Sequence, residues 1–205
     1  MTPSWPSLMN SCAGRPAVVI GKGPTLDAWL AAGCPQPEGA VRIGVNQVAE
    51  VVPEVPFSVS GDGQMDHYFH LPTQWLRGVP YLWADTLVAD CPRADWTFVQ
   101  EKKPGEGWIK ERLSLSREQI AETGYLWYST SSAHPALHFA WYLGCTSVLL
   151  VGMDGRGGRA QSLAVSMDRD PPPDEVYADM LIHTHEAADF LFGLRWSHWA
   201  PFSTN

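Results

Sequence analysis

A helix-forming segment followed at once by a buried strand constrains the fold of this chain more than any other feature. Residues 133–143 are rich in alanine, leucine and aromatic side chains, Gly144 ends this run, and residues 148–151 are a short apolar strand. A similar strand over residues 17–20 leads through a glycine turn into a second helix-like segment. Strands that alternate with helices form parallel sheets whose two faces are covered by helices.

The remaining chain continues this alternation. Apolar runs predict further strands, with those at 81–84 and 96–99 weaker than the others, and helical spacing of Ala187, Phe190, Leu191 and Leu194 predicts a late helix before a final strand. The additional expected segments are strands at 41–45, 57–60, 81–84, 96–99 and 195–200, and helices at 26–32 and, capped by Ser116, at 116–122.

The fold class expected is therefore α/β, a single Rossmann-like domain over residues 1–205 with a mostly parallel sheet and helices on both faces. The length of 205 residues fits one domain. Residues 155–180 begin with a stretch rich in Gly, Arg, Asp and Pro, and are predicted to form a lid or mobile loop.

Composition excludes several function classes. The formal net charge of −8 argues against a broad contact with a nucleic-acid backbone, although a local basic patch leaves a nucleic-acid acceptor open. The four cysteines form no C-x-x-C pair, so neither a structural zinc site nor a disulfide framework is expected. No apolar run is long enough to span a membrane and residues 1–16 do not resemble a signal peptide, which predicts a cytoplasmic protein. The sequence does not indicate an oligomeric state.

The turn Gly21, Lys22, Gly23, Pro24 and Thr25 lies between a predicted strand and a predicted helix. Glycine permits close approach of a ligand to the backbone, and the start of a helix favours phosphate. The turn matches neither G-x-G-x-x-G nor the P-loop pattern. A purely structural turn is the equally weighted alternative.

Polar residues also end the other predicted strands or begin the following helix. Asn46 and Asp62 end two strands and can bind a ribose or phosphate, or simply cap a turn. Ser131 and Ser132 can cap the helix, contact a ligand, or do both. Asp154 follows the best-defined strand and can bind a ligand or hold the next loop.

Two histidines, His183 and His185, flank Thr184 just before the predicted late helix. Two imidazoles at this spacing suggest acid–base chemistry or metal binding. No cysteine or second carboxylate nearby completes a ligand set, so no metal site is predicted. A capping or core role is the structural alternative.

Taken together, these motifs resemble those of the small metal-independent bacterial sialyltransferases and their phage-borne relatives. The resemblance covers about 100 residues in four blocks and does not extend to residues 64–128. The matching segments are Gly21–Leu26 for G-N-G-P-S-L, Gly44–Val48 for a C-N-Q-F-like segment, Ser131–Ala133 for T-S-G, Tyr142–Gly144 for A-L-G, Gly152–Asp154 for G-I-D, and His185 before a helix and a terminal strand.

This resemblance implies a glycosyltransferase that needs no obligatory cofactor and uses a nucleotide-sugar, by family default a CMP-sugar, as co-substrate. It implies that Gly23, Pro24, Thr25, Asn46 and Ser132 bind the donor. It also implies that His185 is the general base toward an acceptor hydroxyl. The acceptor is open: a saccharide, a small molecule or a modified nucleobase.

The chain departs from the family pattern at positions that bear on donor identity. Lys22 replaces an asparagine, Ala133 replaces a glycine, and Arg156 and Arg159 stand near the place of the family's phosphate-binding tyrosines. Arginine can hold a phosphate leaving group through bidentate contacts.

Two other functions remain open from the residues alone. The first is a Mg²⁺-dependent diphosphokinase or other ATP-dependent transferase, in which Lys22, Arg156 and Arg159 hold a polyphosphate and Asp62 and Asp154 hold the metal. The second is a nucleotide-binding protein without turnover.

Overall fold

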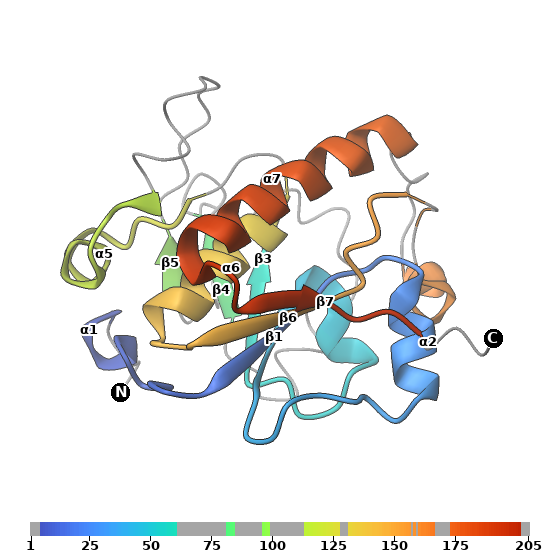
Figure 1. The fold of residues 1–205 in the computed structure, drawn as a ribbon, viewed down its shortest axis with the longest axis horizontal. Helices are drawn as coiled ribbons and strands as arrows, with labels where there is room; N and C mark the ends of the chain where they lie inside the picture. The colour runs from blue at the N-terminus through green and yellow to red at the C-terminus, as the bar shows by residue number, and fades with distance from the viewer. Residues whose placement is uncertain are drawn as a thin grey trace.

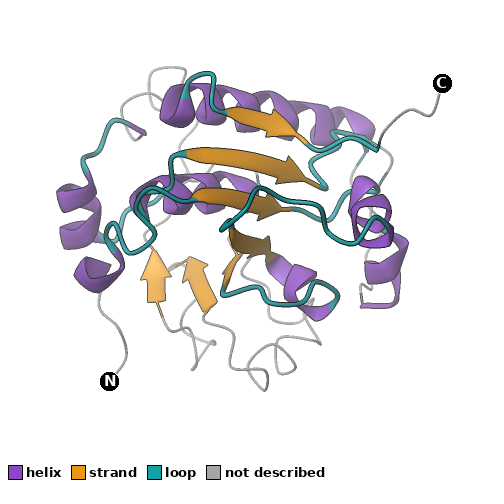
Figure 2. Cartoon of the chain, turned by 60° about the horizontal axis from the view of Figure 1, so that its bottom comes forward, coloured by secondary structure: helices purple, strands orange, loops and turns teal. Residues whose placement is uncertain are grey.

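The computed structural model describes residues 5–60, 81–84, 96–98, 113–127, 131–156, 158, 160–166 and 173–201. These residues form a seven-stranded sheet with the order β5-β4-β3-β2-β1-β6-β7, in which every pair of neighbours is parallel. Helices lie on both sides of it (Figures 1 and 2), which confirms the predicted Rossmann-like α/β class. The strands are β1 Pro16–Ile20, β2 Val41–Val45, β3 Phe57–Ser60, β4 Tyr81–Ala84, β5 Trp96–Phe98, β6 Ser147–Val151 and β7 Trp196–His198.

The helices of the described residues divide between the two faces of the sheet. On β1, Ala17 and Val19 pack into the core formed with α1, α5, α6 and α7, whereas Val18 and Ile20 pack against α2 and η1. This alternation is expected of a strand that is buried on both faces. The helices are α1 Trp5–Leu8, α2 Thr25–Ala31, α5 Arg117–Thr123, α6 Ala133–Tyr142 and α7 Asp174–Phe192, with 3₁₀ helices η1 Asn46–Glu50 and η4 Gln161–Ser166.

The order of the strands reverses at β1. The chain runs outward from β1 through β2 to β5, and then returns to place β6 on the other side of β1 and β7 beyond it. Ligands in open α/β sheets bind outside the carboxyl ends of the strands at such a reversal. The segments that follow β1 and β6 are therefore the ones to inspect for a site.

Most predicted elements are confirmed to within a residue or two. The cap at Ser116 is also confirmed: its hydroxyl accepts a hydrogen bond from the Gln119 amide, and the Gln119 side chain accepts one from the Ser116 amide. This reciprocal pair is a capping box. The short helices α1 and η1 were not predicted, because neither is long enough to show a periodic apolar pattern.

The predicted beginning of the last helix is wrong. Helix α7 begins at Asp174 rather than near Ala187, so His183 and His185 lie inside the helix and not before it. Val176, Tyr177, Met180 and Leu181 recur at helical spacing in its first turns, but the Gly-, Arg-, Asp- and Pro-rich segment before them extended the predicted loop over these residues. Asp174 and Glu175 favour the start through the helix dipole. The loop predicted over residues 155–180 accordingly contains η4 and the first turns of α7.

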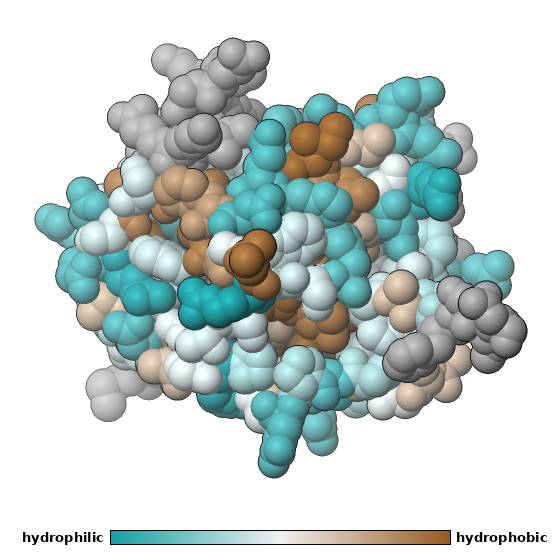
Figure 3. Space-filling model, viewed as in Figure 1, coloured by the Kyte–Doolittle hydropathy of each residue, from teal (hydrophilic) through white to brown (hydrophobic). Residues whose placement is uncertain are grey.

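The apolar face proposed for the late helix is only partly correct. Ala187 and Leu191 are buried, but Phe190 is 47% exposed and Leu194, which lies beyond the helix, is fully exposed. Figure 3 shows apolar patches over α7 and its connection to β7, on an otherwise largely hydrophilic view. Within the described ranges, no helix combines the length and the hydropathy that crossing a membrane requires.

Candidate functional site

The segments that follow β1 and β6 are hydrogen-bonded to each other at the strand-order reversal. The Gly21 amide donates to the carbonyl of Val151 at 2.7 Å, and the Gly23 amide donates to that of Gly152 at 2.8 Å. The predicted turn after β1 and the predicted strand end after β6 are thus brought together, as their shared place at the carboxyl edge of the sheet requires.

Asp154 completes this junction. Its Oδ2 accepts a hydrogen bond from the Thr25 amide at 3.0 Å, and the Thr25 hydroxyl accepts one from the Gly152 amide at 3.2 Å. A Cβ on Gly23 would lie 2.1 Å from Asp154 Oδ2, so only glycine permits the approach. The start of α2, predicted to hold a phosphate, therefore carries the carboxylate of Asp154 instead, which supports the loop-holding alternative for this residue.

The other side of the turn is tied to η4. The Lys22 carbonyl accepts a hydrogen bond from the Ala160 amide at 2.7 Å, and Asp27 on α2 accepts bonds from the amides of Gln161 and Ser162. These contacts hold part of the segment predicted to be a lid against the turn after β1.

His185 on α7 is paired with His198 at the carboxyl end of β7. The two Nε2 atoms are 2.6 Å apart, which is a hydrogen-bond distance, and the ring centroids are 4.7 Å apart. Trp196 packs against the pair, with its ring centroid 5.0 Å from that of His185, and its indole N–H donates to Asp189 Oδ1 at 2.7 Å. The orientation of the His185 ring is therefore fixed by His198 and Trp196 on β7, and Asp189 on α7 holds the Trp196 indole in place.

Burial favours the neutral form of both imidazoles. Burial lowers the pKa of His185, and the carboxylate of Asp189 opposes this shift only in part. Burial and then the neighbouring His185 lower the pKa of His198, while Asp154 acts in the opposite direction. The electrostatic effect of Asp154 on His198 links the imidazole pair to the junction between β1 and β6.

The remaining predicted residues of the sheet edge are less accessible. Asn46 is 4% exposed and has a φ of 56°, and its carbonyl accepts a hydrogen bond from the Ser58 hydroxyl at 2.9 Å. Asparagine is one of the few residues that readily adopt this conformation, so it has a structural role here. At the start of α6, Ser132 is buried and the Ser131 hydroxyl accepts a hydrogen bond from the Ala133 amide at 3.2 Å.

His183 is separate from the pair. Its ring lies edge-on to that of His134 on α6, with centroids 6.3 Å apart, and its Nδ1 is 3.2 Å from a carboxylate oxygen of Glu186. His183 thus lies between the beginning of α6 and exposed acids of its own helix.

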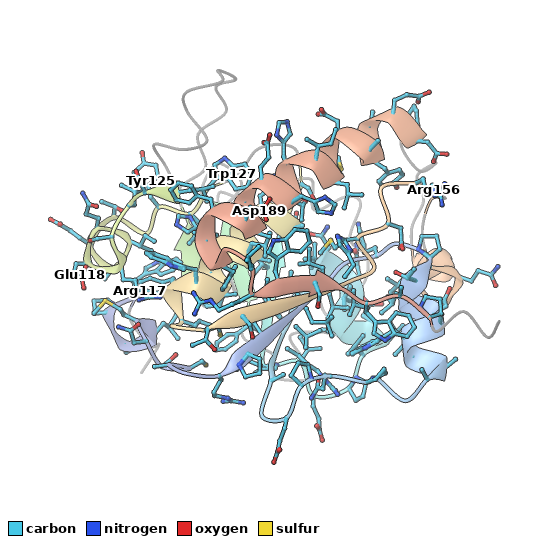
Figure 4. The ribbon with its side chains drawn as sticks, viewed as in Figure 1. Arg117, Glu118, Tyr125, Trp127, Arg156 and Asp189 are labelled. Carbon is cyan, nitrogen blue, oxygen red and sulfur yellow. The ribbon has the colours of Figure 1, made fainter. Side chains whose placement is uncertain are left out.

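The two arginines and Asp62 do not join this arrangement in the described residues. Arg156 is exposed, and Figure 4 shows it on the loop after β6, away from Asp189 on α7. Asp62 and Arg159 lie outside the described residues. Among the residues that are described, no three His, Cys, Asp or Glu side chains are grouped so that they could hold a metal ion.

Sequence reasoning missed His198, although it predicted the strand that carries it. The available signal was position: a histidine near the end of the last strand lies at the same carboxyl edge as Asp154, beside β6 in the sheet. Asp189 was missed because its place, four residues after His185 and on the same side of α7, is visible only once the helix is known to begin at Asp174.

Comparison of the chain with protein-family models, with curated proteins and with solved structures gave no match. The resemblance to bacterial sialyltransferases therefore rests on the motifs quoted from the sequence.

Proposed function

We propose that this protein is a glycosyltransferase, which moves a sugar from a nucleotide-sugar donor to a hydroxyl acceptor with His185 as the general base. The observation that carries the proposal is the place of His185, which is hydrogen-bonded to His198 at the carboxyl edge of a parallel sheet, two strands from the strand-order reversal at β1. Ligand sites occur at this place in such sheets. The resemblance to sialyltransferases supplies the reaction class.

The state of His185 supports the role of a base. A general base must be unprotonated at the working pH, and burial lowers the pKa of this imidazole. In the proposed reaction the acceptor oxygen attacks the anomeric carbon while His185 takes the hydroxyl proton. The bond from that carbon to the donor phosphate oxygen breaks, and the nucleotide leaves with the electron pair.

The position of the donor phosphate has to differ from that expected by resemblance. Because Asp154 accepts a hydrogen bond from the Thr25 amide, a phosphate at the start of α2 would meet a carboxylate. Lys22 lies in the turn that directly follows β1, and we assign the phosphate to this cation. A CMP-sugar remains the default donor.

The test is a nucleotide screen followed by a turnover assay. We expect CMP or another nucleotide to raise the melting temperature, and the matching nucleotide-sugar to release free nucleotide in the presence of EDTA. Strict dependence on Mg²⁺ with release of AMP from ATP would instead support a diphosphokinase. Stabilisation without consumption of any conjugate would support a binding protein, and the absence of any stabilisation would contradict all three functions.

A further inference from the structure

The hydrogen bond between His185 and His198 restricts where the protons of the pair can be. Both rings present Nε2 to each other at 2.6 Å, so one Nε2 must carry a hydrogen and the other a lone pair. A neutral imidazole has a single N–H. The nitrogen that donates in this bond therefore decides what the opposite nitrogen of each ring can do.

Only one of the two arrangements leaves His185 a base. If His198 donates, the hydrogen of His185 is on Nδ1, and no lone pair of His185 remains for an acceptor proton. If His185 donates, its Nδ1 has a free lone pair. Among the described residues, Nδ1 of His185 makes no hydrogen bond.

We propose that His198 is a positioning residue that holds His185 in the Nε2–H form, so that Nδ1 of His185 receives the acceptor proton. The inference rests on the proposed glycosyl transfer and names the nitrogen of His185 that takes the acceptor proton in it. As Nδ1 gains the proton, the hydrogen between the rings moves from Nε2 of His185 to Nε2 of His198. The positive charge then lies on His198. Return of the shared hydrogen to Nε2 of His185, with loss of the Nδ1 proton of His185 to water, restores the pair.

Carboxylates act on both rings of the pair. From α7, the charge of Asp189 favours a proton on His185, and beyond β6 the charge of Asp154 favours one on His198. Each carboxylate also accepts one hydrogen bond, Asp189 from the Trp196 indole N–H and Asp154 from the Thr25 amide. Burial opposes a positive charge on either ring, and Asp154 is the group that counters this effect at His198.

The test reads the tautomers directly, by ¹⁵N NMR of histidine-labelled protein at pH 7. We expect His185 as Nε2–H with a free Nδ1, and His198 as Nδ1–H. In His198→Gln the amide oxygen can still accept from His185, so the tautomer of His185 is retained. His198→Phe removes the acceptor, so His185 populates both the Nε2–H and the Nδ1–H tautomer. Ser197→Ala, an exposed neighbour on the same strand, is the matched control and leaves the spectrum unchanged.

Turnover is measured on the same variants. Both substitutions of His198 should lower kcat by roughly 10–100-fold with little change in the donor KM, as when the partner that orients a metal-bound histidine is removed. The Phe variant should be the slower of the two. If His198 had a purely structural role, both substitutions would lower kcat equally, and the donor KM would change together with kcat.

The outcomes separate this inference from the function on which it rests. Nδ1–H at His185 in the wild-type protein, or an unchanged tautomer and kcat in His198→Phe, overturns the inference even if sugar transfer is observed. The expected tautomers without turnover of any donor overturn the proposed transfer and leave the assignment of the nitrogens in place. If His198→Phe does not fold, the wild-type and His198→Gln spectra still decide the question.

Discussion

Two histidines buried in the core, His134 and His138 on α6, predict that the protein loses stability in mild acid. Both side chains are 0% exposed, and burial lowers the pKa of each from 6.5 to about 3. His138 Nδ1 accepts a hydrogen bond from the Trp127 amide at 2.9 Å, and the His134 ring stacks on the Trp127 ring at 4.4 Å. The folded protein therefore holds both rings neutral where the unfolded chain protonates them.

The sign and size of the pH effect on the free energy of unfolding follow from this difference in pKa between the folded and unfolded protein. A histidine with a lowered folded pKa contributes its full stability above pH 6.5, and this is lost as pH falls toward about 3. One pKa unit corresponds to about 1.4 kcal/mol. At pH 5 each histidine therefore lowers the free energy of unfolding by about 2 kcal/mol relative to pH 7, and the two together lower it by about 4 kcal/mol. That is a large part of the 5–15 kcal/mol by which domains are typically stable.

Urea denaturation at pH 7 and pH 5, followed by tryptophan fluorescence, measures the loss. The design compares the wild-type protein with His134→Gln, whose amide can donate to the Met180 carbonyl, and with His138→Asn, whose oxygen can accept from Trp127. Each substitution should remove about 2 kcal/mol of the pH effect, and the double variant about 4 kcal/mol. The reasoning is refuted if the double variant loses as much stability between pH 7 and pH 5 as the wild-type protein does.

Three further predictions concern the junction, a helix cap and the proposed base. Gly23→Ala places a Cβ against Asp154 Oδ2 and should destabilise the protein by about 1–3 kcal/mol in thermal or urea unfolding, with partial recovery on adding Asp154→Ala; additive effects of the two substitutions would contradict the contact. Ser116→Ala removes a capping box and should cost about 1 kcal/mol, and an unchanged unfolding midpoint would argue against the cap. The acid limb of kcat/KM should have its midpoint below pH 6.5, because burial lowers the pKa of His185, and a midpoint above 6.5 would exclude a neutral buried base.

The centre of the sheet was predictable because strand β1 and most of its neighbours β2 and β6 are buried and have continuous apolar runs. Val18–Ile20 and Val148–Val151 are examples, and they define the strand-order reversal once their parallel pairing is assumed. Only the second half of helix α7 was predicted, although Val176, Tyr177, Met180 and Leu181 before Thr184 are also at helical spacing. The Gly, Arg, Asp and Pro residues that precede the helix indicate a loop, and composition alone does not show where that loop ends.

The sequence predicted which residues of the candidate site lie at the edge of the sheet, but it did not predict which of them contact each other. The sequence placed Thr25 and Asp154 at one edge of the sheet, but it could not decide whether Asp154 faces a ligand or the backbone of the turn. It also selected His185 without its partner. A contact between α7 and β7 depends on how the helix packs, so the pairing of His185 with His198 became visible only in three dimensions.

The central claim is that His185 acts as the base in sugar transfer from a nucleotide-sugar, and one comparison tests it most directly. Nucleotide release is measured in the presence of EDTA for the wild-type protein, for His185→Ala and for Ile182→Ala, an exposed control on the same helix. We predict that His185→Ala lowers kcat by roughly 10²–10⁴-fold with nearly unchanged donor affinity, while the control retains wild-type turnover. Equal turnover in all three proteins would contradict the claim.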